Sequence, residues 1–173
     1  MTNADKKVYW SHFQVNDWRF YLAKTDAGVC YIGSPNRPFT EVETWLNKKL
    51  PKHTLLESDN DLQKEIDQLT DYINGKRQNF TINMNPVGTE FQRIVWQALQ
   101  TIPFGETRTY SEIAADINHP EAVRAVGTAI GANPLLIVIP CHRIIAKNGK
   151  LSGFRAGVDV KQTLLQLEKN NQA

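Results

Sequence analysis

The chain has 173 residues, which is enough for one ordinary domain or two small ones with a hydrophobic core. Hydrophobic residues make up 41% of the sequence and charged residues 22%, as in soluble globular proteins, and no stretch is long and apolar enough to span a membrane. The formal net charge of +2 is too small to indicate nucleic-acid binding, so any such function must depend on the local arrangement of residues.

The first third of the chain is predicted to be rich in β-strands. Aromatic and β-branched residues are concentrated in three segments, and the turn signals "ND" and "DAG" separate these segments. The predicted strands cover residues 7–15, 18–25 and 28–34.

Two helices and an extended link are predicted next. The first helix covers residues 39–50 and is ended by Pro51. The second covers residues 61–76, and Gly75 is positioned to cap its C-terminus. Its apolar stripe consists of Leu62, Ile66, Leu69 and Ile73. An extended link is expected over residues 76–88.

The second half of the chain is predicted to be mostly helical. Residues 89–102 and 109–117 each begin with a threonine that is followed three residues later by glutamine or glutamate, which is the spacing of a capping box. A third helix is predicted within residues 119–134, with Pro120 at its first position. A C-terminal helix is predicted over residues 158–170.

Two shorter features lie between these helices. The apolar run at residues 135–139 predicts a short buried strand, and the Asn-Gly pair within residues 147–150 predicts a tight hairpin. The change in character near residue 80 indicates an α+β protein. We expect a β-rich N-terminal domain at residues 1–82 and a mostly helical C-terminal domain at residues 83–173.

The helices predicted at residues 109–117 and 119–134 have the size of a helix-turn-helix. At 100° per residue, the second helix has an apolar side made of Ala122, Val123, Ala125, Val126, Ala129 and Ile130. Arg124 lies on the other side, among residues with small side chains, including two glycines. Because each glycine costs a helix about 1 kcal/mol relative to alanine, something is expected to approach closely. A nucleic acid with Arg124 projecting into it and another helix that leaves Arg124 solvated are both compatible with the pattern.

Cys141 and His142 stand side by side at the end of the apolar run, in "IPCHRII". A cysteine reacts as its thiolate, and a histidine can withdraw the proton directly or through a water molecule. Adjacent residues of an extended chain point to opposite sides, so the pair needs a turn, which Pro140 favours. Cys141 could instead be a small buried hydrophobic residue, which is the interpretation for Cys30 because no histidine stands beside it.

Glu168 is the candidate carboxylate partner. It follows Leu164 by four residues, on the inward face of the last predicted helix, and lies in the final turn, where a negative charge opposes the helix dipole. Such a carboxylate needs a partner, and a histidine or an arginine would serve. A solvated glutamate at a frayed helix end is the alternative.

No metal site or cofactor is predicted. The four histidines are scattered, the two cysteines are far apart, and neither a P-loop nor a GxGxxG or GxSxG motif occurs. Two cysteines cannot form a disulfide framework, and the N-terminus lacks the apolar core of a signal peptide. A cytoplasmic location is therefore expected.

Several motifs, in register, resemble the O6-alkylguanine-DNA alkyltransferases, most closely the bacterial methylated-DNA–protein-cysteine methyltransferases of the Ogt type. The resemblance runs from about Met84 to Glu168. It is carried by "GTEFQ" at 88–92, "IPFGETRTYSEIA" at 102–114, "RAVG" at 124–127, "NP" at 133–134, "PCHR" at 140–143 and "GKLSGF" at 149–154. The family implies a ribonuclease-H-like fold for the N-terminal domain. The zinc ligands that some relatives carry there do not occur in residues 1–80.

The resemblance implies a chemical role for the thiol. The family repairs DNA by direct, irreversible transfer of the alkyl group from O6-alkylguanine, flipped out of duplex DNA, to the cysteine that matches Cys141, and O4-alkylthymine is expected as a second substrate. His142 would take the thiol proton through a bound water, and Glu168 would hold His142 in the useful tautomer. Asn133 would brace the turn that carries the cysteine.

The resemblance also implies how the chain meets DNA. Arg124 would fill the gap in the base stack, Tyr110 would press on the phosphate and help rotate the nucleotide, and the second helix would enter the minor groove. Further DNA contacts are expected at Thr109, Ser111, Ala125, Gly127, Thr128 and Gly131. The base is expected to meet Tyr110, Ile130, Asn133 and Phe154, the last standing where many relatives carry tyrosine.

The thioether product resists water, so each molecule is expected to act once, without a cofactor. The expected partner is double-stranded DNA that contains alkylated guanine, and no membrane is involved. The protein is expected to be a monomer, with cooperative binding on DNA left open. Two other functions remain compatible with the residues: a lesion-reading or regulatory helix-turn-helix module, and a thiol hydrolase that uses Cys141, His142 and Glu168.

Overall fold

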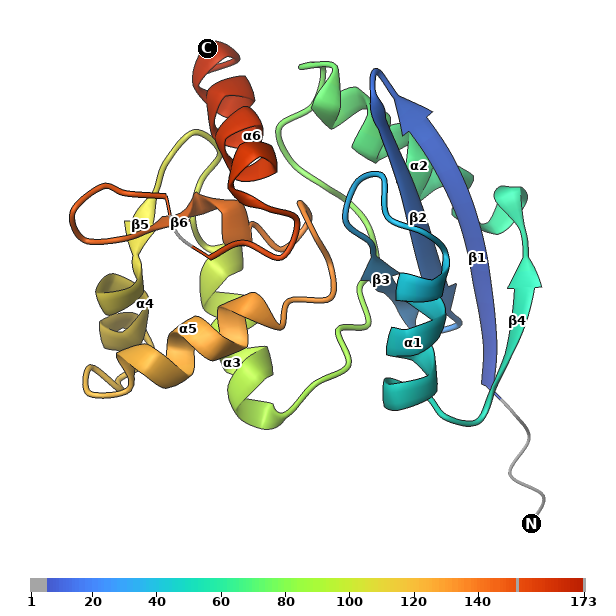
Figure 1. Cartoon of the computed structure of the whole chain (residues 1–173), viewed down its shortest axis with the longest axis horizontal. Helices are drawn as coiled ribbons and strands as arrows, with labels where there is room; N and C mark the ends of the chain where they lie inside the picture. The colour runs from blue at the N-terminus through green and yellow to red at the C-terminus, as the bar shows by residue number, and fades with distance from the viewer. Residues whose placement is uncertain (1–5, 152, 173) are drawn as a thin grey trace. The chain divides into compact units, whose positions relative to one another are not determined.

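The computed structural model describes residues 6–151 and 153–172, and the chain divides into two compact units, Met1–Val87 and Gly88–Ala173. The described part of the first unit contains a four-stranded sheet and two helices, whereas the second is mostly helical (Figure 1). The predicted α+β fold class is therefore confirmed.

The sheet of the N-terminal unit has the strand order β3-β2-β1-β4. β1 (Lys6–Val15), β2 (Trp18–Thr25) and β3 (Gly28–Ile32) pair antiparallel and match the three predicted strands closely. β4 (His53–Glu57) pairs parallel with β1 and was not predicted. This strand is short and mostly exposed, and its partner is distant in the sequence, so no local pattern marks it.

The two helices of this unit cover opposite faces of the sheet (Figure 1). α1 (Thr40–Lys49) shares a core cluster of buried residues with one face, and α2 (Asp59–Ile73) packs against β1 on the other. The predicted cap of α2 is confirmed, since Gly75 has a φ of +77° and its N–H donates to Tyr72 O at 3.0 Å.

The C-terminal unit contains the predicted helices at nearly the predicted bounds. They are α3 (Glu90–Gln100), α4 (Tyr110–Asp116) and α6 (Val158–Asn170). In α3 and α4 the N-cap threonine and the third helical residue exchange hydrogen bonds, so both predicted capping boxes are confirmed. Trp96 of α3 is buried and donates its ring N–H to the carbonyl of Ala129 in the helix that follows α4, at 2.9 Å.

That helix, α5 (Val123–Gly131), begins later than predicted. The predicted position of Pro120 at the helix start is wrong, because this residue lies in a turn that is closed by a hydrogen bond from the Ala122 N–H to His119 O at 2.9 Å. The fixed φ of proline suits the second position of a turn as well as the first position of a helix. The sequence could not distinguish the two.

The strand predicted at residues 135–139 is also wrong. The segment is buried, as its composition indicates, but it forms a tight turn in which the Ile139 N–H donates to Leu135 O at 3.0 Å. Ile137 takes a φ of +72°, which β-branched residues rarely adopt. Apolar composition predicts burial but does not decide between a strand and a turn.

Candidate active site

The tight turn before Cys141 is held by the side chain of Asn133, which is 1% exposed. Its Oδ1 accepts from the Leu135 N–H at 2.9 Å, and its Nδ2 donates to Ile139 O at 2.8 Å. The same Nδ2 lies 3.1 Å from the Sγ of Cys141. Asn133 therefore contacts both ends of the turn and the sulfur, which explains how Ile137 is kept in its unfavourable conformation.

Cys141–Arg143 form one turn of 3-10 helix. The turn begins after Pro140, whose carbonyl accepts from the Arg143 N–H at 3.0 Å. In such a helix successive side chains diverge by about 120°, so neighbouring residues no longer point to opposite sides. All three side chains are buried in the C-terminal unit. The turn that cooperation between Cys141 and His142 requires is thus present.

Glu168 is completely buried and stands at the centre of a hydrogen-bond network. Its Oε2 lies 2.7 Å from His142 Nε2 and 2.9 Å from Arg143 Nη2. Its Oε1 accepts from Arg143 Nε at 2.8 Å and from the Gly105 N–H at 3.1 Å. The inward position predicted for this glutamate is confirmed, and the solvated alternative is wrong.

Arg143 is the main residue that the sequence analysis missed. Two of its guanidinium nitrogens donate hydrogen bonds to Glu168, and its Nη1 donates to Ile102 O at 2.7 Å. Its guanidinium also lies over the ring of Phe104, 5.7 Å from the centroid. The signal was available, because a buried glutamate in the last turn of α6 calls for a cation and Arg143 directly follows His142.

Burial dominates the electrostatics of the thiol and the imidazole. It raises the pKa of the Cys141 thiol, although the hydrogen bond from Asn133 and the charges of Arg155 and Lys161 partly oppose the shift. Burial lowers the pKa of His142, and the hydrogen bond to Glu168 opposes that shift. In the resting protein Cys141 is therefore a thiol and His142 is neutral.

Lys161 is a second missed residue. Its side chain is completely buried on the inward face of α6, and burial lowers its pKa while the nearby Cys141 opposes that shift. Lys161, Leu164 and Glu168 are spaced i, i+3 and i+7, so they share one helix face. Once Glu168 is assigned to the inward face, the same periodicity assigns Lys161 to it.

The α4–α5 surface carries the residues that the sequence singled out for DNA. Arg124, Ala125, Thr128, Gly131 and Ser111 are exposed. The placement of Ala125 on the apolar side is therefore wrong; it lines a shallow groove between α5 and the start of α3. Thr109 is used as the N-cap of α4.

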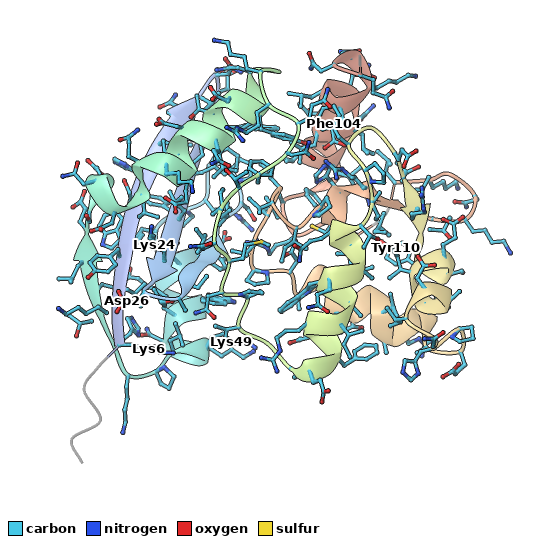
Figure 2. All side chains as sticks on the ribbon, turned by 180° about the vertical axis from the view of Figure 1, so that it is seen from behind. Lys6, Lys24, Asp26, Lys49, Phe104 and Tyr110 are labelled. Carbon is cyan, nitrogen blue, oxygen red and sulfur yellow. The ribbon has the colours of Figure 1, made fainter. Side chains whose placement is uncertain are left out.

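Tyr110 stands at the start of α4 (Figure 2). A Cβ on Gly127 would lie 3.6 Å from Tyr110 Cδ1, which is an ordinary van der Waals distance, so the ring lies beside Gly127 without requiring a glycine there. A Cβ on Gly131 would meet nothing within 4 Å, so that position stays open to an approaching partner. The strand pair β5 (Arg108–Thr109) and β6 (Ile144–Ile145) ties the start of α4 to the turn that carries the thiol.

The remaining residues singled out in the sequence are Ile130, Phe154 and Cys30. Ile130 is 4% exposed, inside the unit, and Phe154 is half-buried in the loop before α6, so their contact with a bound base stays a prediction. Cys30 is completely buried, with its pKa raised to about 12 by burial, which fits the structural interpretation. Among the described residues, no group of His, Cys, Asp and Glu is placed to hold a metal ion, and no helix could cross a membrane.

Two family models together match most of the chain. One, described as "6-O-methylguanine DNA methyltransferase, ribonuclease-like domain", matches residues 8–86. The other, described as "6-O-methylguanine DNA methyltransferase, DNA binding domain", matches residues 90–170.

Two relatives are similar in sequence to this chain over nearly its whole length. The inducible methylated-DNA–protein-cysteine methyltransferase of Bacillus subtilis (strain 168) is 51% identical over 162 residues, covering 94% of this chain and 90% of the relative. A methylated-DNA–protein-cysteine methyltransferase of Methanosarcina acetivorans is 49% identical, covering 93% of this chain and 98% of the relative.

Solved structures show the same likeness. The Mycobacterium tuberculosis O6-methylguanine methyltransferase has a TM-score of 0.81 at 35% identity, covering 96% of this chain and 95% of that one. The structure of OGT from the same organism in complex with DNA has a TM-score of 0.80 at 34% identity, covering 94% of each chain.

Proposed function

Because this chain belongs to the 6-O-methylguanine DNA methyltransferase family, we propose that Cys141 is the cysteine that receives the alkyl group. The chain repairs DNA by moving an alkyl group from the damaged DNA onto one of its own cysteines. The observation that supports Cys141 is the Asn133–Cys141 contact beside the buried His142–Glu168 pair. Cys30 lies in a strand of the other unit, and its described hydrogen bond goes to the backbone carbonyl of Ala23 rather than to a histidine.

The proposed reaction is a single displacement. The sulfur of Cys141 bonds to the alkyl carbon while the bond between that carbon and O6 of guanine breaks. The thiol proton passes to His142, and guanine, which leaves as an anion, takes up one proton to become neutral. Water does not readily cleave the resulting thioether, so each molecule reacts once.

The tautomer of His142 follows from its partner. Arg143 donates to both oxygens of Glu168, so the carboxylate is held in its ionised form, which only accepts hydrogen bonds. Nε2 of His142 must then donate to Glu168, and Nδ1 is the basic nitrogen of the neutral ring. We infer that Glu168 orients the ring and stabilises the imidazolium once it has taken the proton.

Arg143 is proposed as a positioning residue, because it touches neither the thiol nor the imidazole ring in any described hydrogen bond and acts through Glu168. A buried carboxylate without a cation would be costly, and the bidentate contact fixes the plane of the carboxylate as well as its charge. The carbonyl of Ile102 and the ring of Phe104 fix the guanidinium in turn.

The α4–α5 surface is proposed to bind the damaged duplex, with Arg124 entering the base stack. Its support is the exposed Arg124 among small side chains and the open space at Gly131. Arg124→Ala should slow repair of duplex DNA by about 10-fold to 100-fold, because removing the alkylated base from the stack costs a few kcal/mol that the arginine helps to offset. The rate constants of single-turnover reactions with duplex and with free O6-methylguanine base measure this effect. Equal losses on both substrates would contradict the role.

Lys161 is proposed to favour the thiolate of Cys141, since its charge lowers the pKa of a thiol that burial raises. Lys161→Met should raise the pKa of Cys141 further, so transfer should slow at pH 7 and recover as the pH rises. Iodoacetamide alkylation of Cys141, followed from pH 6 to 10, measures this pKa. The Lys169→Met variant, on the exposed side of α6, is the matched control and should leave the profile unchanged. An unshifted profile for Lys161→Met would exclude this role.

Three finer points belong to the same proposal. We expect O4-alkylthymine to react as a second substrate, the protein to act as a monomer, and its location to be the cytoplasm, where the two free cysteines would stay reduced. Transfer of a labelled methyl group from a duplex to the chain, up to one group per molecule, tests the function itself. Labelling beyond that ratio would contradict a single reaction per molecule.

A further inference from the structure

A cluster of lysines lies at one end of the N-terminal unit, and we refer to it as the lysine cluster. It consists of Lys6, Lys7, Lys48, Lys49 and Lys52. The fold brings their backbones to one end, since the Lys6 N–H donates to Lys52 O at 3.0 Å and α1 ends at Lys49, shortly before Lys52. Lys6 and Lys7 are successive residues of β1, so their side chains point to opposite faces of the sheet at this end. Figure 2 shows Lys6 and Lys49 at the same end of the unit.

The positive charges of the lysine cluster exceed the negative charge that Asp26 brings to the same end of the unit. Lys49 is half-buried and the other four are exposed, and none of the five forms an ion pair within the described residues. The ion pairs of this unit involve Lys24 with Glu65 and Arg37 with Glu41 instead. Two of the lysines complement the negative C-terminal end of α1, but the helix dipole does not explain the other three.

The acidic side chains of the unit are concentrated on α2, but Asp26 lies at the same end as Lys6 (Figure 2), and the β1–β2 register, extended by two residues, places it opposite Lys7. α2 carries Asp59, Asp61, Asp67 and Asp71, and Figure 1 places α2 on the opposite face of the sheet from α1. The unit therefore has one strongly basic region and one acidic helix. A large anion would meet the unit in a preferred orientation, with the lysine cluster facing it.

We propose that the lysine cluster binds the phosphate backbone of duplex DNA, as a contact surface additional to the α4–α5 face. The inference rests on the proposed function, which makes DNA the polyanion that the protein must find. The chain as a whole is only +2, so long-range attraction is weak and local charge density must supply it. Flexible lysines suit sequence-independent contacts, because they follow phosphates without reading bases.

The test is the salt dependence of binding to lesion-free duplex DNA. The variant Lys48→Gln/Lys52→Gln removes two exposed charges of the lysine cluster. The matched control, Lys64→Gln/Lys76→Gln, removes two exposed charges of the same unit outside it. Each lost phosphate contact should reduce the slope of log affinity against log salt by about 0.9, so the cluster variant should lose about one to two units. The control should retain the wild-type slope.

The measured slopes distinguish phosphate contacts of the lysine cluster from an effect of net charge and from a contact with a second copy of the chain. Equal slopes for both variants would overturn the proposal, since net charge alone would then explain binding. A changed sedimentation coefficient for the cluster variant without DNA, at unchanged DNA affinity, would identify a surface for a second copy and would also overturn it. Reaction with free O6-methylguanine base should be unchanged in the cluster variant. If the wild type reacted with no alkylated substrate, the proposed function would fail whatever the salt slope.

Discussion

The Cys141→Ser variant should transfer no detectable alkyl group while it still binds alkylated duplex DNA. A serine hydroxyl is a far weaker nucleophile than a thiolate at neutral pH, and the neutral imidazole of His142 cannot compensate for that difference. The side chains differ little in size, and the serine can still meet Asn133. Transfer of labelled methyl groups and binding of the same duplex should both be measured on this variant.

The Cys30→Ser variant is the matched control for that experiment. Cys30 lies in β3 and donates only a weak hydrogen bond to Ala23 O at 3.6 Å. Its replacement should lower the stability of the N-terminal unit modestly and leave the yield of transfer at one group per folded molecule. Transfer that survives in Cys141→Ser and disappears in Cys30→Ser would reverse the assignment.

Arg143→Met should have the largest effect on stability. It leaves the completely buried Glu168 without its cation, which costs about 3–5 kcal/mol for a buried ion pair. Urea unfolding measures the loss. In whatever fraction folds, the carboxylate should take up a proton more readily, so the acidic limb of the pH–rate profile should move to higher pH.

A double-mutant cycle separates positioning from simple packing. Arg143→Met/Glu168→Gln removes both charges, so it should be more stable than Arg143→Met alone, with a coupling of at least about 2 kcal/mol. Arg143→Lys keeps the charge but loses the bidentate contact, and it should restore stability more than it restores the rate. Additive stabilities together with an unmoved pH–rate profile in Arg143→Met would show that Arg143 only fills space.

Local patterns in the sequence predicted most of the fold. The two capping boxes, the glycine cap of α2 and the bounds of α6 depend on residues within one helix or next to it, and each of these was correct. β4 depends on pairing with a distant strand, and the turn at residues 135–139 depends on one asparagine side chain. Neither arrangement leaves a periodic signal.

The site, like the fold, could be predicted from the sequence in part. The inward position of Glu168 follows from helix periodicity, and its closeness to His142 came through the family resemblance. The hydrogen bonding of Arg143 to that carboxylate is a tertiary contact between α6 and the 3-10 turn, so no local pattern in the sequence predicts it. The burial of Arg143 and of Lys161 was missed for the same physical reason. Charged side chains are usually exposed and are buried only where the tertiary structure provides a partner, which a local sequence pattern does not show.

Cys141 itself should carry the alkyl group after repair. The protein should be mixed with a duplex that contains one O6-methylguanine, and the proteolytic peptides with Cys30 and Cys141 should be weighed. We expect one added methyl group on the Cys141 peptide, at a ratio that stops at one per molecule, and an unchanged Cys30 peptide. If the duplex binds while the Cys141 peptide keeps its original mass, Cys141 is not the alkyl acceptor.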